Sequence, residues 1–516
     1  MLNNSKSDKQ TLCFDKIGYP SNTMDYFLLA GIVLIGFSLR YYKLAGNLYS
    51  DELWINVTAA SPFPAFYQEF IQDWVHPPLI HFLARAWVYI FGPSDLSGRL
   101  VSLIFGVLSI PLIYWLGKMV SGSKAGLIAA SLLALSPVHI YHSQYGRHYS
   151  LFVFFVLLSM LAFLKVYYRP NDRNYCIFYC LSTILLVYTH YFGWLIVFCQ
   201  SLFFIFLRYT FLKRWILLQA FILLSYIPWI ILVLKFTMEP ASNQLLVPGA
   251  NQLLVPHIVW LKKIYLSELL NTIALFNGNL PLFHQRNLGL FLLGGISILS
   301  MKNIFSKDKH YRDSILFIFS CVVIPFILVY VVSRTIQPIW IFRGMLLSVP
   351  AYYLLISSGS QQFTSKKISI ALMIIPILWM SLASWHYTLN EHRMPFEQIS
   401  KYLERESESG DPILVENSWL SNPIFHYYKG KGNLYELQES NVSIVPVSNK
   451  MNLSRIHSQK RESGSRLILV TYQPESAEEF RGELFSTYRF VKVDRFSGYG
   501  EQGQREYVDI FVFKKR

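Results

Sequence analysis

The feature that most constrains this chain is a succession of long apolar runs separated by short polar stretches. Many of these runs approach the roughly 20 residues that a helix needs to cross about 30 Å of hydrocarbon. Inside a bilayer the chain itself must satisfy every backbone polar group, so only helices or a closed barrel can cross it. Because the runs lack the alternation of barrel strands, the sequence predicts an α-helical polytopic membrane protein.

The composition agrees with a membrane protein and argues against other classes. Of the 516 residues 53% are hydrophobic and only 15% are charged, whereas a soluble domain is about 25% charged. The net charge of +15 comes mostly from short loops between apolar runs, as in cytoplasmic loops, so we expect no nucleic-acid partner. The five cysteines form no CxxC pair and predict no disulfide framework. No removable signal peptide is predicted in residues 1–25.

The positions of the basic loops predict the topology. About eleven spans place these loops inside, with the N-terminus in the cytoplasm and the C-terminus outside. The 13-residue stretch 79–91 is too short to cross and is expected to lie in the interface. A full span there is the alternative, and it would invert everything downstream. The predicted spans are 26–42, 98–117, 125–141, 150–168, 175–190, 193–207, 215–234, 287–301, 313–333, 340–358 and 368–387.

The domain organisation follows from this topology. A cytoplasmic N-terminus (1–25) precedes a membrane domain (26–387) with outer loops at 43–96 and 235–286. The second loop contains NQLLVP twice, which is too short a repeat for a solenoid. Residues 388–516 are richer in charge and predict a small α/β domain on the outer, periplasmic face. Its expected helix face is Phe396, Ile399, Tyr402 and Leu403, and its expected strands are 412–416, 466–472, 489–493 and 507–513.

Several polar clusters fall at the same outer boundary in this topology. Ionisable groups at membrane depth are costly and usually functional. Carboxylates, histidines and arginines from separate spans suit a reaction that moves an anionic group. The clusters are Ser50-Asp51-Glu52, DWVHPP at 73–78, SPVHIYHSQYGRHY at 136–149, Thr189-His190-Tyr191 and Arg334–Arg343.

Four ordered motifs resemble the GT-C glycosyltransferases, in the bacterial branch related to protein O-mannosyltransferases and lipid A aminoarabinose transferases. They are YSDELW at 49–54, HPPL at 76–79, FGPSDLSGRLVS at 91–102 and SPVHIYHSQYGRHYSL at 136–151. The resemblance extends through THYFGW at 189–194 and weakly into 339–355. It implies a GT-C-like fold, a polyprenyl-phosphate sugar donor and an enzyme of the cytoplasmic (inner) membrane.

The resemblance also implies residue roles. An acidic residue of the first outer loop is the catalytic base in that family, and by position it is Asp51, with Glu52 beside it. A carboxylate can take the proton of an acceptor hydroxyl as the hydroxyl attacks the anomeric carbon, and direct attack inverts that carbon. The departing phosphate needs cationic stabilisation, which the planar fork of arginine supplies. The donor-binding candidates are Arg343, Arg147, Arg99, His76, His190 and Tyr191.

The sequence departs from the family motifs at one position, and several candidate residues also have a structural explanation that involves no catalysis. The aminoarabinose branch has a lysine before its proline in the second motif, where this chain has His76, so the aminoarabinose substrate is in doubt. Asp51 has the alternative of capping a helix, and Arg99 that of reaching lipid headgroups. The histidines at 139, 142, 148 and 190 have no defined metal-ligand spacing. No cofactor is therefore predicted, and a divalent metal ion is left open.

Two other functions remain open at this stage. A transporter or flippase for a lipid-linked glycan shares the span count, although the chain shows no related halves. A polysaccharide polymerase or ligase would transfer whole glycans from a lipid diphosphate. The sugar, the acceptor (glycan, lipid or protein) and the carrier lipid are not identified, and the C-terminal domain is expected to help select the acceptor.

Overall fold

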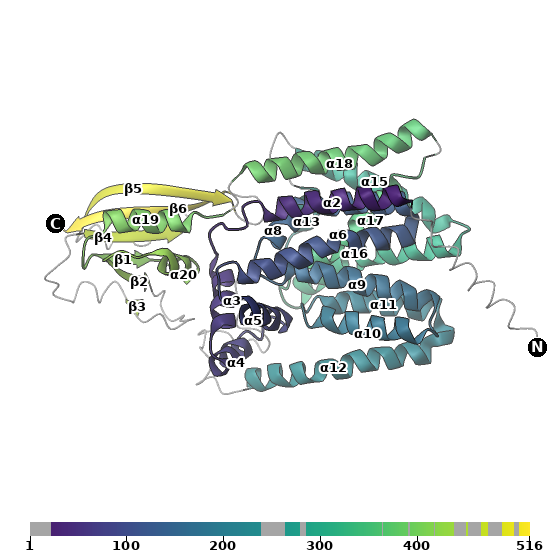
Figure 1. The fold of residues 1–516 in the computed structure, drawn as a ribbon, viewed down its shortest axis with the longest axis horizontal. Helices are drawn as coiled ribbons and strands as arrows, with labels where there is room; N and C mark the ends of the chain where they lie inside the picture. Colours follow the sequence, from purple (N-terminus) through teal and green to yellow (C-terminus); the bar gives the residue numbers. More distant parts are fainter. Residues whose placement is uncertain are drawn as a thin grey trace, which may run out of the picture. The chain divides into compact units, whose positions relative to one another are not determined.

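The structure, a computed structural model, divides into two compact units, each described here by itself. The first is the helical membrane unit (Figure 1). The second combines residues 45–57 with the chain after residue 388. The NQLLVP repeat lies outside the described residues. These are 22–238, 264–278, 285–363, 365–390, 393–416, 418–437, 450–451, 466–472, 488–499 and 505–515.

Each predicted span coincides with helical structure in the first unit (Figure 1). In the described residues seven helices are long and apolar enough to cross a membrane, or eight if the bent pair α7–α8 is one span. The remaining predicted spans, α10, α11 and η5–α17, are shorter apolar helices. The bounds are α2 (Thr23–Tyr41), α6 (Ser97–Ser121), α7 (Ser123–Ala134), α8 (Pro137–Ser143), α9 (Tyr149–Tyr168), α10 (Arg173–Val187), α11 (Gly193–Leu207), η1 (Tyr209–Phe211), α12 (Leu212–Met238), α14 (Gln285–Gly289), η3 (Leu290–Gly294), α15 (Gly295–Leu299), η4 (Ser300–Phe305), α16 (Lys309–Thr335), η5 (Gly344–Ser348), α17 (Val349–Gly359) and α18 (Lys366–Leu389).

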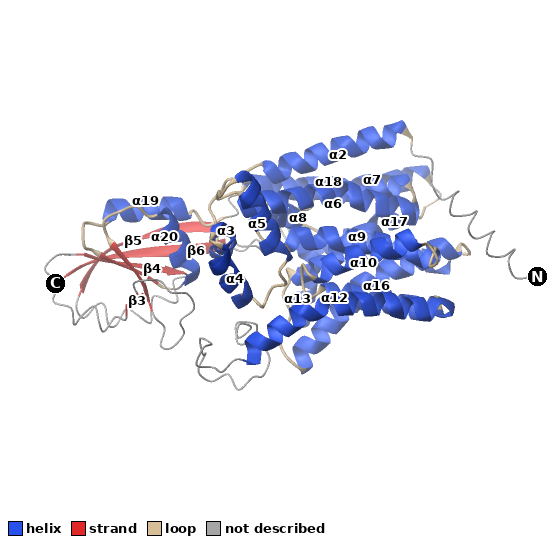
Figure 2. Ribbon diagram, turned by 60° about the horizontal axis from the view of Figure 1, so that its bottom comes forward, coloured by secondary structure: helices blue, strands red, loops and turns tan. Residues whose placement is uncertain are grey.

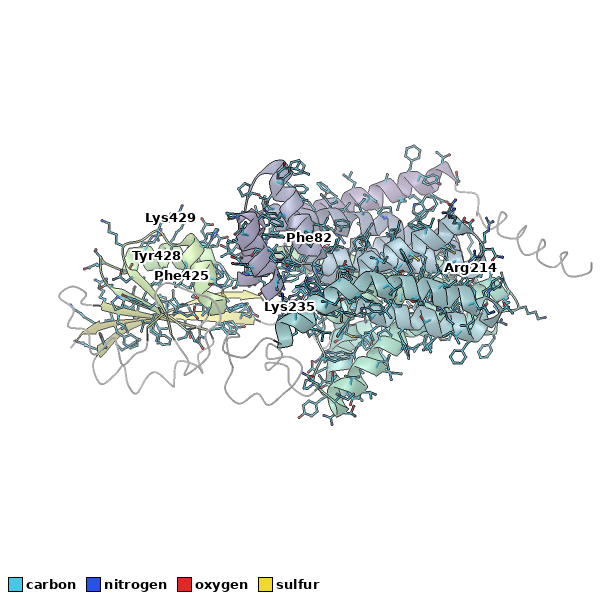
Figure 3. All side chains as sticks on the ribbon, turned by 90° about the horizontal axis from the view of Figure 1, so that it is seen from below. Phe82, Arg214, Lys235, Phe425, Tyr428 and Lys429 are labelled. Carbon is cyan, nitrogen blue, oxygen red and sulfur yellow. The ribbon has the colours of Figure 1, made fainter. Side chains whose placement is uncertain are left out.

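Helix α9 forms the centre of the first unit. Most of its residues are buried, whereas α2 and α12 expose most of theirs, as expected of helices that face lipid. It packs against α6 and α10 (Figure 1). Figure 3 shows Arg214 and Lys235 at opposite ends of α12, with the apolar length of the helix between them.

Four shorter helices belong to the segments between spans: α3 (Ser50–Ala60), α4 (Phe63–Gln72), α5 (Leu79–Phe91) and α13 (Leu266–Phe276). The predicted helix at 79–91 is confirmed with the same bounds. It buries Ile80, His81 and Ala84 and exposes apolar side chains such as Phe82 on another face (Figure 3). Gly92 ends it with a φ of +82°, which favours glycine. This amphipathic surface suits an interfacial helix.

The predicted span 125–141 is broken, because the helix is interrupted between α7 and α8 and bends there by 62°. Pro137 has no N–H, so the carbonyl of Leu133 loses its helical donor. The fully buried Arg40 of α2 replaces that donor. Its guanidinium donates to the carbonyls of Leu133 and Ala134, both at 2.9 Å, and to His139 Nδ1 at 2.7 Å. Arg40 therefore stabilises the bend from a different helix.

Substitution of Arg40 tests this role. Arg40→Met is expected to destabilise the protein by about 2–5 kcal/mol, because it removes the buried guanidinium donors of the carbonyls of Leu133 and Ala134. The measurement is thermal unfolding in detergent. Arg214→Met is the matched control, since Arg214 is less buried and donates to Pro170 O and Asn171 Oδ1 at the end of the bundle. Equal, small losses for both variants would contradict the assigned role.

The second unit contains a six-stranded sheet with the order β3-β2-β1-β4-β6-β5 (strands red in Figure 2). Strands β1 to β4 pair in parallel, and β6 is antiparallel to β4 and β5. The four predicted strands are confirmed, whereas β2, β3 and α20 were not predicted. The bounds are α19 (Phe396–Glu406), β1 (Pro412–Val415), α20 (Ser418–Tyr427), β2 (Asn433–Leu437), β3 (Lys450–Met451), β4 (Arg466–Tyr472), β5 (Tyr488–Tyr499) and β6 (Arg505–Lys515).

The core of the second unit lies between the sheet and its helices. Helix α19 buries Phe396, Ile399 and Leu403, as its spacing predicts. The fourth residue of the predicted face, Tyr402, is only partly buried and instead hydrogen-bonds Asp494 of β5. At the described size this unit can bury its own apolar cluster.

Candidate active site

A carboxylate with two histidines forms the start of a polar cluster in the first unit. Helix α4 ends at Asp73, and the chain then turns through the DWVHPP motif. Asp73 Oδ1 lies 2.7 Å from His76 Nδ1, and Asp73 Oδ2 lies 3.1 Å from His81 Nε2 on α5. Burial would raise the pKa of Asp73, but the charges and hydrogen bonds of His76 and His81 outweigh it and hold that pKa well below its usual range.

Arg147 extends this cluster. Its Nη2 lies 3.1 Å from His76 Nε2, and because a guanidinium only donates, this histidine nitrogen accepts. His76 thus connects Asp73 to Arg147 through its two ring nitrogens. The backbone of Arg147 is fixed by Ser102, whose hydroxyl donates to its carbonyl at 2.8 Å, while Ser150 donates to the carbonyl of Ser102. The predicted partners His76 and Arg147 are therefore brought together by α6 and the α8–α9 connection.

Two fully buried histidines lie beside this chain of contacts. The ring of His148 is 5.0 Å from that of His76 and 4.4 Å from that of Tyr149, and the ring of His142 is 4.9 Å from that of Tyr149. Among the described residues, neither ring nitrogen of His142 or of His148 has a hydrogen-bond partner. Burial, followed by the charge of His76, lowers the pKa of His148. Buried nitrogens of this kind indicate a place for water or a ligand.

Arg343, which lies far from these residues in the sequence, also contacts the ring of Tyr149. It lies at the start of η5, where its Nη1 is 3.4 Å from the hydroxyl of Tyr149 and its guanidinium is 5.7 Å from the centre of that ring. Gly344 follows it, and a side chain there would collide with Phe192 at 2.5 Å. Arg147 and Arg343 therefore lie at the two ends of one row of rings, His76, His148 and Tyr149. We name these five residues the ring row.

The other donor-binding residues predicted in the first unit are His190, Tyr191 and Arg99, and each has defined contacts. The ring of His190 is 5.1 Å from that of His148, so it borders the ring row. Tyr191 donates to the carbonyl of Trp74 and accepts from Trp229 Nε1 at 3.2 Å, which fixes the DWVHPP segment. Arg99 is buried and donates to the carbonyl of Leu44 at 2.8 Å. Arg99 as a phosphate ligand stays a prediction.

The sequence predictions omitted three residues that this geometry brings into the cluster as site residues: Asp73, His148 and Tyr149. The sequence could have indicated Asp73, because it precedes His76 by three residues in the DWVHPP motif, close enough for their side chains to pair. The participation of His148 and Tyr149 depends on the turn between α8 and α9, which the sequence pattern does not specify.

The acidic pair lies in the second unit. Asp51 is in the first turn of α3 and is partly exposed, and no hydrogen bond or ion pair to it occurs among the described residues. Glu52 is 1% exposed. Its Oε2 accepts from the Tyr49 N–H at 3.0 Å and lies 3.4 Å from Arg393 Nη1. The two neighbouring carboxylates therefore differ, with Asp51 accessible and Glu52 held in a structural network.

No group of three or more His, Cys, Asp or Glu side chains placed to hold a metal ion occurs in the part of the chain that the structure describes. The histidines at 142, 148 and 190 lie among aromatic rings instead.

The fold defines a class of protein, a polytopic helical membrane protein with a GT-C-like fold and a C-terminal sheet. Over 95% of this chain and 98% of the other, the fold matches the crystal structure of ArnT from Cupriavidus metallidurans bound to undecaprenyl phosphate, with a TM-score of 0.58 and 12% identity. The oligosaccharyltransferase of Archaeoglobus fulgidus in complex with zinc and sulfate matches over 93% of this chain and 72% of the other, with a TM-score of 0.52 and 14% identity.

The sequence comparisons match part of the chain to a known family. Residues 75–232 match the model of the family described as dolichyl-phosphate-mannose-protein mannosyltransferase. A polyprenol-phosphate-mannose–protein mannosyltransferase of Corynebacterium glutamicum is 31% identical over 100 residues, which is 19% of this chain and 19% of that protein. The match to part of the chain and the similar fold together confirm the resemblance seen in the motifs, to GT-C glycosyltransferases such as the mannosyltransferases and ArnT.

The pH dependence of stability tests the Asp73 contacts. The folded pKa of Asp73 is depressed, so its pairing stabilises the protein above the unfolded carboxyl pKa near about 4. This stabilisation is lost as the pH falls through the folded pKa. Asp73→Asn should therefore lower the free energy of unfolding at neutral pH by about 1–3 kcal/mol, which is measured as a lower unfolding temperature. The difference from the wild type should shrink toward acid.

The matched control for this measurement is Asp172→Asn. Asp172 caps α10 by accepting from the N–H groups of Asn174 and Tyr175, and an asparagine can accept in the same way. It is expected to change stability little at any pH. A loss in Asp73→Asn that is independent of pH would contradict the proposed pairing.

Proposed function

We propose that this protein transfers a sugar from a polyprenyl-phosphate donor to an acceptor hydroxyl, with inversion at the anomeric carbon. The observation that carries the proposal is the ring row, in which Arg147 contacts His76 and Arg343 contacts Tyr149, at the two ends of a series of neighbouring rings. The membrane fold gives a lipid-soluble donor access to such a site. The Corynebacterium relative is named for a polyprenol-phosphate-mannose donor, and the ArnT structure was determined with undecaprenyl phosphate bound.

The arginines suit the leaving group of this reaction. The sugar leaves behind a lipid phosphate, whose negative charge grows as the glycosidic bond breaks, so cationic donors stabilise the transition state. Guanidinium groups bind phosphate oxygens through paired N–H donors. The unpartnered nitrogens of His142 and His148 offer further hydrogen bonds to a ligand oxygen. His76 receives its orientation from Asp73 and presents its second nitrogen to Arg147.

Asp51 is proposed as the general base. The YSDELW motif supports this role, and the partial exposure of Asp51 leaves its carboxylate accessible to an acceptor. Glu52 is the weaker candidate, because its carboxylate is buried against Tyr49 and Arg393. A carboxylate base within hydrogen-bond distance of the acceptor hydroxyl typically contributes about 10²–10⁴-fold to the rate.

We propose that the protein lies in the cytoplasmic membrane with its site and C-terminal domain on the outer face. The distribution of basic loops supports this orientation. Arg214, at the end of α12 opposite Lys235 (Figure 3), is one of the residues expected inside. The acceptor is a glycan, a lipid or a protein of that compartment.

The direct experiment uses purified protein in liposomes with a labelled polyprenyl-phosphate sugar. Transfer of the label to an envelope acceptor, or its release to water, supports a transferase. Movement of the intact labelled lipid between leaflets without turnover would instead favour a flippase. Products that grow by whole glycan units would favour a polymerase or ligase.

The phosphate-binding role of the arginines predicts a charge-dependent loss of activity. Arg147→Met and Arg343→Met are each expected to lower kcat/KM by about 10²–10³-fold. The lysine variants should retain part of the activity, because an ammonium keeps the charge but loses the paired donors. Steady-state kinetics with varied donor measure both effects. Arg214→Met, at the other end of the bundle, should behave like the wild type, and equal losses in all three methionine variants would argue against a specific phosphate site.

Asp51 should affect chemistry and not donor binding. Asp51→Asn is expected to lower kcat by about 10²–10⁴-fold while the KM for the donor changes little. Asp51→Glu retains a carboxylate in a shifted position and should keep an intermediate rate. Normal transfer by Asp51→Asn at unchanged expression would remove Asp51 from the proposed role.

A further inference from the structure

The segment that carries Asp51 is part of the same compact unit as the C-terminal domain. Residues 45–57 belong to the second unit, although they precede the domain by more than 300 positions in the sequence. The segment has the short helix α3 and little apolar core of its own. Its placement within this unit therefore depends on contacts with residues 393–427.

The domain holds the segment just before α3 through three hydrogen bonds, two to backbone groups and one to a side chain. The N–H of Leu48 donates to the hydroxyl of Tyr427 at 3.0 Å. Arg393 Nη1 donates to the carbonyl of Asn47 at 3.0 Å. The N–H of Glu397, in the first turn of α19, donates to Asn47 Oδ1 at 2.9 Å. Two adjacent residues of the segment are thus fixed immediately before α3 begins.

Side chains next to Asp51 are held as well. Asn422 Nδ2 of α20 donates to the hydroxyl of Ser50 at 3.0 Å. The buried ring of Tyr49 packs edge-on against Phe396, with centroids 5.9 Å apart, and lies 6.0 Å from Trp419. The two residues that precede Asp51, Tyr49 and Ser50, therefore both contact the C-terminal domain.

The residue after Asp51 completes this arrangement. Glu52 lies 3.4 Å from Arg393, whose Nη1 also reaches Asn47. One guanidinium thus joins both ends of the turn Asn47–Glu52. A buried carboxylate that loses such a cation is strongly destabilised, so the turn and Arg393 stabilise each other.

From these contacts we propose that the C-terminal domain positions the base of the reaction, with Arg393, Tyr427 and Asn422 as positioning residues for Asp51. The inference rests on the proposed function, in which Asp51 takes the acceptor proton. A displacement of a catalytic group by about 1 Å can cost about 100-fold in rate. The domain therefore contributes to the chemical step, in addition to any part in acceptor selection.

The sharpest test compares two neighbouring tyrosines of the domain. Tyr427→Phe removes the hydroxyl that accepts from the Leu48 N–H. Tyr428→Phe is the matched control, because the Tyr428 hydroxyl accepts from Gly432 N–H at 2.9 Å and bonds Ser407, all within the domain (Tyr428 in Figure 3). Hydrogen exchange of full-length protein in detergent should become faster for residues 45–57 in Tyr427→Phe alone. Its kcat should fall by about 10-fold with an unchanged KM for the donor.

Arg393 provides a second variant with a larger expected effect. Arg393→Met should speed exchange across 45–57 and lower kcat by about 100-fold. Arg393→Lys should restore part of both, because an ammonium can still pair with Glu52. Lys401→Gln should resemble the wild type, because Lys401 is an exposed residue of α19 that pairs with Glu397 of the same helix.

The outcomes separate this inference from the proposed function. Unchanged exchange of 45–57 in both Tyr427→Phe and Arg393→Met would overturn the anchoring, and faster exchange with unchanged kcat would overturn its catalytic importance. A rise in donor KM without a fall in kcat would also contradict it. If the wild-type protein transfers no sugar, the proposed function fails, while the exchange experiment still decides the anchoring.

Discussion

The structure of the membrane unit depends on the need to satisfy every backbone polar group away from water. That constraint permits a break in a span only where another group replaces the lost hydrogen bond. At Pro137 the replacement is the guanidinium of Arg40, which reaches the carbonyls of Leu133 and Ala134 from α2. The bend that results directs α8 and the following turn, and with them Arg147 and His148, into the ring row. A residue that touches none of the proposed reacting groups thus determines where they lie.

The ring row shows how such a unit can hold cationic and polar groups at low exposure. Arg147 is joined to Asp73 through His76, and Arg343 lies over the face of Tyr149. Carboxylate pairing and aromatic faces both stabilise a guanidinium without occupying all its donors. The buried nitrogens of His148 complete a surface that is cationic overall and rich in hydrogen-bond donors. An anionic headgroup is the ligand that such a surface favours.

The sequence predicted the elements well and their long-range contacts poorly. Hydrocarbon thickness demands long apolar runs, so every predicted span coincides with a helix, and the strands 466–472 and 507–513 followed from their alternation. The break at Pro137 was missed because its stabilising partner is 94 positions away. Helix α20 was missed because it is short and contains Pro423. Of the site, His76, Arg147 and Arg343 came from motifs, whereas Asp73 and His148 join them only through the fold.

The turn that carries Asp51 and its partners in the C-terminal domain are far apart in the chain, and this separation affects when the protein can become active. The turn that carries Asp51 is made early, but its partners Arg393 and Tyr427 follow 341 and 379 positions later. Contacts at such separation carry a large entropic cost of loop closure and form late in folding. Arg147 contacts His76 and Arg343 contacts Tyr149, and all four residues belong to the membrane unit. With Asp51 as the proposed base, transfer would therefore await the folding of the last domain, even where these contacts had already formed.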